Sequence, residues 1–291
     1  MKKILLIASA LLFAVSCSQW SDGSEVKTVR YVDKLLFADG RSVTFNYSSY
    51  DTGTVLVSSI AYSDGRVIEV SYENLGTYTP TIWINDGVTS QQLKFESGCV
   101  RAVVESGRDV VTMSYTMNNT FLSNLTNDVQ HSNTVYSIYN GCFTDIVSEW
   151  YLNASKHADE IVKSQIVRLG YDYQISNYLS SVDLLQFIVP EFSQTMGLDP
   201  AVVASIGITS FRSYYLPHGA SIMTSSYDVL DSDDDVDAQA VGPVEGTTVT
   251  EIRRISYERD NDGYVTKVYT SIGDAAEASV LFSVVYKTMS E

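Results

Sequence analysis

The feature that most constrains the fold is a turn signal that recurs every 9 to 13 residues in the first part of the chain. Each signal is a glycine that follows a polar turn residue or its near equivalent, at Gly40, Gly53, Gly65, Gly76, Gly87, Gly98 and Gly107. One strand of about five to eight residues and one turn fill each gap. Because parallel strands need connections of a dozen or more residues, the spacing predicts an antiparallel meander over residues 26–117.

Two of these units have nearly the same sequence, FADGRSVTFNY at residues 37–47 and YSDGRVIEVSY at residues 62–72. Asp-Gly between alternating apolar residues is a strong signal for a hairpin with a type I′ turn, in which glycine takes a positive φ. Apolar and polar side chains alternate after each turn, which is typical of a half-buried strand. The repeat therefore predicts a strand–turn–strand unit used more than once, with Gly40 and Gly65 at positive φ.

The rest of the chain mixes strands with short helices. Residues 118–133 look like a loop, a hairpin is expected around Asn140-Gly141, and residues 161–173 suit a helix or a strand. The segment SSVDLLQFIV, which stops at Pro190, predicts a short helix. A second helix is expected after Asp199, with Pro200 at its first position. Strand patterns then return, so the fold class is mainly all-β: a curved antiparallel sheet or barrel-like shell with a few short helices in the middle of the chain.

The N-terminus predicts a lipoprotein. Two lysines precede a short apolar run over residues 4–15, and the segment FAVSCS resembles a bacterial lipobox. The apolar run is too short for a transmembrane helix, which needs about 20 residues. We therefore expect a signal peptide over residues 1–16, lipid on Cys17, a tether over residues 17–25, and a place in the cell envelope at the outer membrane. An ordinary signal peptide, with Cys17 incidental, is the alternative.

The remaining residues, 26–291, are expected to form one β-rich domain with an acidic loop at 228–246. The formal net charge of −16 makes nucleic acid an improbable partner, because a phosphate backbone repels an acidic protein. The acidic run in the loop lacks the glycine and glutamate of an EF-hand, so we expect a solvated loop and no calcium site. Cys99 and Cys142 remain as an even pair, for which a disulfide and two separate buried thiols both stay open.

No motif predicts a catalytic residue, a cofactor or a metal. The three histidines lack metal-ligand spacing, and the sequence has no nucleophile elbow, phosphate loop or C-x-x-C. The aromatic excess is the one unusual feature, since 20 tyrosines outnumber 10 phenylalanines and 3 tryptophans. Sheet packing explains most tyrosines. The candidates for an exposed binding platform are Trp83, Trp150, Tyr214 and Tyr215.

Several segments together resemble a domain of unknown function with a porin-like fold, found in lipoproteins of Bacteroides-type bacteria. They are the lipobox, the early Asp-Gly meander, YNGCFTDI at 139–146, YQISNYLSSVDLLQFI at 173–188 and YERDNDGYVTKV at 257–268. The resemblance covers most of the chain after residue 17. It implies a curved antiparallel sheet or barrel-like shell and supplies no catalytic residues.

These observations favour a non-catalytic envelope lipoprotein, held at the membrane by its N-terminal lipid, that binds a glycan or an envelope protein. One alternative is a subunit of a larger envelope complex without a ligand of its own. Another is an extracellular polymer hydrolase, which would need two carboxylates facing each other in a cleft.

Overall fold

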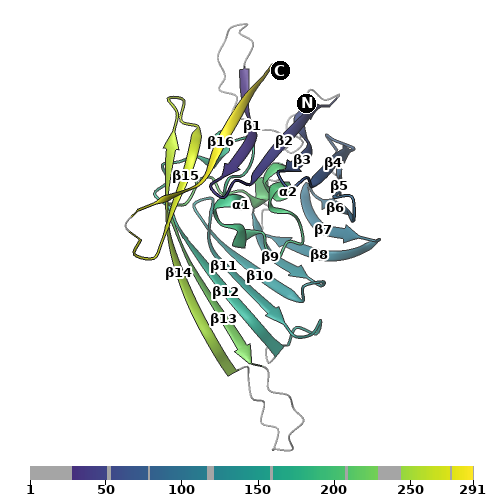
Figure 1. Ribbon diagram of the computed structural model, residues 1–291. Coiled ribbons are helices and arrows are strands. Elements are labelled where there is room, and N and C mark those ends of the chain that lie inside the picture. Colours follow the sequence, from purple (N-terminus) through teal and green to yellow (C-terminus); the bar gives the residue numbers. More distant parts are fainter. Residues whose placement is uncertain are drawn as a thin grey trace, which may run out of the picture.

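Sixteen antiparallel strands form one closed barrel in the computed structural model (Figure 1). The structure describes residues 28–50, 54–77, 79–116, 121–157, 160–206, 209–228, 244–275 and 277–290. Each strand pairs with the next along the chain, and β1 pairs with β16 to close the sheet. The predicted meander is therefore confirmed, and the same up-and-down order continues around the whole barrel.

The first eight strands are β1 (Thr28–Phe37), β2 (Ser42–Ser49), β3 (Val55–Tyr62), β4 (Val67–Glu73), β5 (Thr81–Asn85), β6 (Ser90–Glu96), β7 (Cys99–Glu105) and β8 (Arg108–Tyr115). The other eight are β9 (Leu122–Asn127), β10 (Ser132–Tyr139), β11 (Cys142–Tyr151), β12 (Ile161–Gly170), β13 (Gly219–Asp228), β14 (Val244–Arg259), β15 (Val265–Ile272) and β16 (Ser279–Ser290). The short helical turns are η2 (Asn177–Leu179), α1 (Leu185–Ile188), η3 (Pro190–Phe192), α2 (Pro200–Ser205) and η4 (Thr209–Phe211).

Gly40 and Gly65 have the expected positive φ, at 87° and 91°. The turn type differs from the prediction, because a type I′ turn also needs positive φ at its two central residues, and neither Ala38 nor Asp39 has it. The Gly40 amide donates to the Phe37 carbonyl at 3.0 Å, and the Phe37 amide donates to the Arg41 carbonyl at 2.9 Å. This pattern is a type I turn followed by a glycine bulge, a common three-residue hairpin connection.

The tyrosine that ends each copy of the repeat, and likewise Tyr115 at the end of β8, satisfies a backbone carbonyl at a β-bulge. Tyr47, Tyr72 and Tyr115 each donate a hydroxyl to a carbonyl fifteen residues earlier in the chain, those of Val32 at 2.7 Å, Val57 at 3.0 Å and Val100 at 2.6 Å. In all three cases the acceptor directly precedes a residue that the register leaves unpaired. A bulge interrupts the ladder locally, so the hydroxyl replaces a lost hydrogen bond.

Tyr72→Phe is expected to lower the free energy of unfolding by about 1–3 kcal/mol, because it leaves the buried Val57 carbonyl without its donor. Urea unfolding, with the midpoint and slope both fitted, measures the change. Tyr139→Phe is the matched control, since this exposed tyrosine should tolerate the change within about 0.5 kcal/mol. An equal effect of the two variants would show that the hydroxyl bond at the bulge contributes nothing.

The barrel has an apolar interior and a largely polar exterior. Along β4, Ile68, Val70 and Tyr72 are buried, whereas Glu69 and Glu73 on the opposite face are exposed. Oppositely charged side chains pair across the outside of other strands, as in Arg168–Asp145 at 3.6 Å and Lys267–Glu258 at 3.0 Å. A transmembrane barrel has the reverse pattern, with an apolar band outside and a polar lumen inside.

The connection between β12 and β13 fills part of the interior, and we call its described residues, 171–206 and 209–218, the plug. Figure 1 shows α1 and α2 inside the barrel. One buried cluster joins apolar side chains of the plug to inward side chains from strands all around the wall. Phe192 of the plug is fully buried, with its ring 4.8 Å from that of Phe143 and 5.3 Å from that of Tyr136. The plug is therefore part of the hydrophobic core.

A buried carboxylate organises the start of the plug. Asp183 accepts hydrogen bonds from the side-chain amides of Asn177 at 2.6 Å and Gln186 at 2.9 Å, and from the Leu185 amide at 3.0 Å. Burial raises the pKa of Asp183, although the nearby positive charge of Arg212 opposes the shift. Arg212 in turn donates to the carbonyls of Asn177 and Ser180. These bonds fix a segment that has little regular secondary structure.

Two sequence-based expectations for the middle of the chain are resolved by the structure. Residues 122–127 form β9 and not a loop, because Leu125 faces the core while Asn127 donates its side-chain amide to the Thr195 carbonyl of the plug at 2.9 Å. The ambiguous segment after residue 160 is strand β12. The second helix starts as predicted, with Asp199 capping it and Pro200 in its first turn.

Other expectations lie outside the described residues. They are the signal peptide, Cys17, the tether to residue 25, and all but the ends of the acidic loop. Within the described ranges, no helix is both long and apolar enough to cross a membrane.

Candidate functional site

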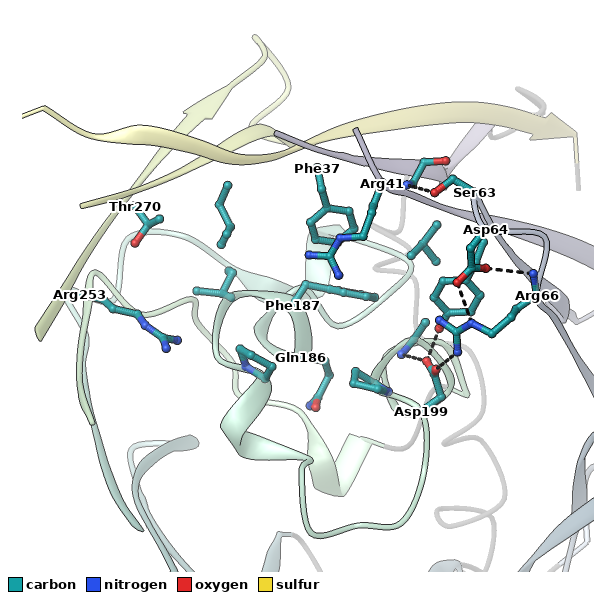
Figure 2. A pocket seen from close by; sticks show the side chains of 18 of the residues that line it. Phe37, Arg41, Ser63, Asp64, Arg66, Gln186, Phe187, Asp199, Arg253 and Thr270 are labelled. Carbon is teal, nitrogen blue, oxygen red and sulfur yellow. Dashed lines mark hydrogen bonds and ion pairs between the residues drawn. The ribbon is translucent and has the colours of Figure 1, made fainter. Parts of the chain in front are cut away.

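A cavity of about 620 Å³ lies between the plug and one side of the barrel wall (Figure 2). Its volume is in the usual range of small-molecule sites. The lining residues come from the β1–β2 and β3–β4 hairpins, the plug, β14, β15 and β16: Phe37, Arg41, Ser42, Val43, Tyr62, Ser63, Asp64, Arg66, Gln186, Phe187, Ile188, Pro190, Asp199, Pro200, Ala201, Glu251, Arg253, Thr270, Ile272 and Leu281.

The sequence repeat builds one wall of this cavity. Arg41 lies over the Phe37 ring, 5.6 Å from its centre, and Arg66 lies over the Tyr62 ring at 4.3 Å. The Asp-Gly-Arg turn explains this placement, because the aspartate accepts both the backbone amide and the side-chain nitrogen of the arginine two residues later. For Asp64 and Arg66 these distances are 3.0 and 2.9 Å. Each copy therefore places an aromatic ring and a guanidinium side by side at the cavity.

Asp199 joins this wall to the plug. As the N-cap of α2 its carboxylate accepts the Ala201 amide at 2.9 Å, and it also accepts the hydroxyl of Tyr62. Arg66 approaches the same carboxylate at 3.9 Å. Burial raises the pKa of Tyr62, and the Asp199 charge adds to the shift, so this hydroxyl stays protonated as a donor.

A second set of ion pairs joins the plug to the wall on the opposite side of the cavity. Arg253 of β14 makes a bidentate pair with Glu191 of the plug, at 2.7 and 3.1 Å, and also pairs with Glu251. Burial by itself lowers the pKa of Arg253, but the hydrogen bonds and charges of Glu191 and Glu251 together outweigh that effect and raise the pKa of Arg253. Figure 2 shows Arg253 and Arg66 on opposite sides, with Phe37 and Phe187 between them.

The charges that line the cavity balance. Arg41, Arg66 and Arg253 face three carboxylates, those of Asp64, Asp199 and Glu251. Hydrogen bonds from the backbone and side chain of Arg66 lower the pKa of Asp64, so this carboxylate is held ionised. The rest of the lining is mostly apolar, with phenylalanine, proline and aliphatic side chains. The cavity therefore offers a nearly neutral surface that carries paired donors and acceptors.

The aromatic residues singled out in the sequence lie in three separate places. Trp83 of β5 faces outward from the wall. Trp150 of β11 lies under the ammonium group of Lys163, which is 4.4 Å from its ring centre. Tyr214 and Tyr215 follow η4, and the ring of Tyr214 packs 5.6 Å from that of Phe121. None of these residues lines the cavity.

Cys99 and Cys142 are buried thiols, not bonded in a disulfide, at the starts of β7 and β11. The structure therefore contains separate thiols and not the disulfide that was the other open alternative. Burial raises the pKa of both thiols, which makes them poor nucleophiles. Among the residues that the structure describes, no group of three or more His, Cys, Asp or Glu side chains is placed to hold a metal ion.

The sequence analysis did not predict the cavity, although the sequence shows the two repeated turns that form one of its walls. The pattern aromatic-x-Asp-Gly-Arg occurs at residues 37–41 and 62–66, and was interpreted as turn chemistry alone. In each turn an arginine follows an aromatic residue by four positions. Because the two turns are equivalent, this spacing indicates that the two arginines lie on the same side of the wall. The plug residues and Arg253 carry no comparable local signal.

Similarity to known proteins is found among solved structures only. No family model matches the chain. No curated protein sequence matches it either. The barrel is similar to the crystal structure of a porin-like protein from Bacteroides uniformis, with 15% sequence identity over 89% of this chain and 96% of the other, and a TM-score of 0.49.

Proposed function

We propose that this protein is a lipid-anchored envelope scaffold that binds a neutral glycan in the cavity between plug and wall, without catalysis. The observation that carries the proposal is the composition of the cavity. Arg66 is paired with Asp64 and Asp199, Arg253 is paired with Glu251, and the floor between them is largely apolar. A ligand of net charge would meet one favourable and one unfavourable partner at each pair. A neutral ligand avoids that penalty.

Sugars suit this arrangement chemically. Each hydroxyl group both donates and accepts hydrogen bonds, so it can bridge a guanidinium and a carboxylate that stand side by side. The apolar faces of a sugar ring can pack against Phe187 and the aliphatic side chains of the floor. Arg41 is the most accessible of the three arginines, with 76% of its side chain exposed, and is available to contact a ligand at the mouth.

The state of the carboxylates supports binding without hydrolysis. A glycosidase needs one carboxylic acid that remains protonated near neutral pH, next to a second, ionised carboxylate. Here Asp64 is paired with Arg66, and Glu251 is paired with Arg253. The hydrogen bonds from Arg66 lower the pKa of Asp64, so this carboxylate is not suited to donate a proton.

The polar exterior supports a barrel that lies outside the bilayer. Glu69, Glu73 and the Arg168–Asp145 pair face away from the core. Each charge at the midplane of a membrane would cost about 2–4 kcal/mol for a basic side chain, and somewhat less for an acidic one. The proposed lipid on Cys17 would then provide the membrane attachment.

One apolar row does cross the outside of the barrel. Val135, Val147, Ile166 and Met223 are aligned by the register of β10 to β13. The next outward pair toward either barrel end is charged or polar, such as Glu149 with Ser164 on one side and Asp145 with Arg168 on the other. This row alone is far narrower than the apolar band of about 25 Å in membrane-spanning barrels, and Leu36, Val67 and Ile252 are further exposed apolar side chains on the wall.

Neutral oligosaccharides on a glycan array, followed by calorimetry with the strongest binder, test the proposed site. Arg41→Ala should weaken binding by at least about fivefold, and Ile272→Trp, which fills the cavity, by at least about tenfold. Arg168→Ala is the matched control, because it removes an equally exposed arginine with an acidic partner on the outer wall.

Absence of binding to any neutral glycan would contradict the proposal, as would equal affinities of the three variants. Release of reducing sugar from a bound polymer, abolished by Glu251→Gln, would show instead that the cavity is an active site.

A further inference from the structure

We infer that the end of the barrel at which β1 begins docks onto the surface of a lipid bilayer through a tyrosine patch. The patch consists of four exposed side chains, those of Tyr139 (62% exposed), Tyr214 (44%), Tyr173 (40%) and Leu179 (37%). Exposed apolar groups that gather at one place on a protein mark interaction sites, whereas scattered ones are ordinary.

The antiparallel order puts all four at the same end of the barrel. Even-numbered strands finish where β1 begins, so Tyr139 at the end of β10 and Tyr173 just after β12 share that end. The plug leaves and re-enters the wall there, which brings Leu179 and Tyr214 to it as well. Figure 1 shows the ends of β1 and β16 at this end, opposite the joined ends of β13 and β14.

Contacts tie Tyr214, Leu179 and Tyr173 to neighbouring turns and tyrosines at this end of the barrel. The ring of Tyr214 lies directly against Gly141 in the β10–β11 turn, and its centre is 5.6 Å from that of Tyr178. Leu179 follows Tyr178 and reaches within 3.6 Å of the position a Cβ would take at Gly263, in the β14–β15 turn. On the other side, the rings of Tyr215 and Tyr173 are 5.7 Å apart.

The N-terminal lipid would hold this end, and not the other, near the membrane. Only residues 18–27 separate Cys17 from the start of β1, and ten residues extend at most about 35 Å. A tether of this length gives the nearest surface of the barrel a high effective concentration at the bilayer. The orientation therefore rests on the lipid anchor of the proposed function, whereas the patch itself does not.

The chemistry of the patch fits the interfacial region of a bilayer. Tyrosine presents an apolar ring and a polar hydroxyl, the combination that favours the boundary between acyl chains and headgroups. Arg30 lies beside the patch and pairs with Asp260 at 2.6 Å and with Asp262 at 2.8 Å, so one positive charge offsets part of the two negative charges there. Docking in this orientation turns the β3–β4 turn, and with it the cavity, away from the membrane.

Vesicle cosedimentation tests the docking without the lipid. The closed barrel starts at Thr28, so a chain from Ser18 to Glu291 keeps every strand. It is expected to bind phosphatidylethanolamine–phosphatidylglycerol vesicles, and the double variant Tyr139→Ser with Tyr173→Ser should bind at least about tenfold more weakly. Trp83→Ser is the control, because it removes an exposed aromatic from the outer wall. Unchanged thermal unfolding of each variant shows that the fold is intact. Leu179→Ser changes a different residue of the patch and should also weaken vesicle binding.

Equal vesicle binding by the parent chain and both patch variants would overturn the inference, as would a parent chain that does not bind vesicles. A dimer in sedimentation velocity that the tyrosine variants dissociate would also overturn it, because a second copy would then be the occupant. Glycan binding by the same chain is measured separately, so failure of the docking leaves the proposed function standing, and failure of glycan binding leaves the docking standing.

Discussion

Asp183→Ala is expected to lower the free energy of unfolding by at least about 3 kcal/mol, because three buried donors lose their acceptor at once. Asp183→Asn should stay within about 1 kcal/mol of the parent at pH 7. Its side-chain oxygen can still accept from Asn177 and Leu185, and Gln186 can turn its amide oxygen, which has no partner, toward the new amide group. Chemical denaturation of both variants measures the difference.

The same pair of proteins should differ in their pH dependence. Burial raises the pKa of Asp183 in the folded state above that of the unfolded chain. Asp183 therefore contributes to the free energy of unfolding of the parent at low pH. This contribution is lost as the pH rises through the folded-state pKa. We expect Asp183→Asn to gain stability relative to the parent between pH 4 and pH 7. A constant difference across that range, or a loss as large as that of the alanine variant, would contradict this account of the plug.

Phe192→Ala is expected to lower the free energy of unfolding by about 3–5 kcal/mol, the usual range for a fully buried aromatic side chain. The ring packs between Phe143 and Tyr136 of the wall, and the backbone carbonyl of Phe192 itself accepts the Tyr136 hydroxyl at 3.0 Å. Because plug and wall share this core, unfolding should remain a single transition. Val88→Ala, at a position that is 92% exposed, is the control and should change stability by less than about 0.5 kcal/mol.

A loss below about 1 kcal/mol for Phe192→Ala, or a separate early transition, would mean that the plug moves independently of the barrel. The plug would then be a lid and not part of the core, and the cavity beside it would have no fixed shape.

Local patterns predicted most of the wall. The regular glycine turns and the alternation after them indicated an antiparallel meander, because turn geometry and side-chain period are set by neighbouring residues. Strand β9 was missed because its outward positions, Asn124 and Thr126, resemble loop residues. Its inward Asn127 is polar for a tertiary reason, the hydrogen bond to the plug. Closure of the barrel depends on pairing between β1 and β16, which no local pattern specifies.

The site was harder to predict than the fold. The repeated Asp-Gly-Arg turns contained two of the three cavity arginines, but their common direction depends on the hairpins being neighbours in one wall. Asp199 was predicted as a helix cap, and it also binds Tyr62 because the plug packs inside the barrel. Glu191 and Arg253 are 62 positions apart and meet only in the folded protein. Contacts of this kind follow from topology and not from sequence spacing.

The measurement that tests the central claim most directly is membrane fractionation of the full-length protein and of Cys17→Ala. If a water-facing, plugged barrel is anchored by lipid and does not span the bilayer, the parent stays in the membrane pellet. Cys17→Ala is then released without detergent by an alkaline carbonate wash and adds no conductance to planar bilayers. A Cys17→Ala protein that stays in the pellet until detergent dissolves it, or that conducts ions, would show that the barrel itself spans the membrane.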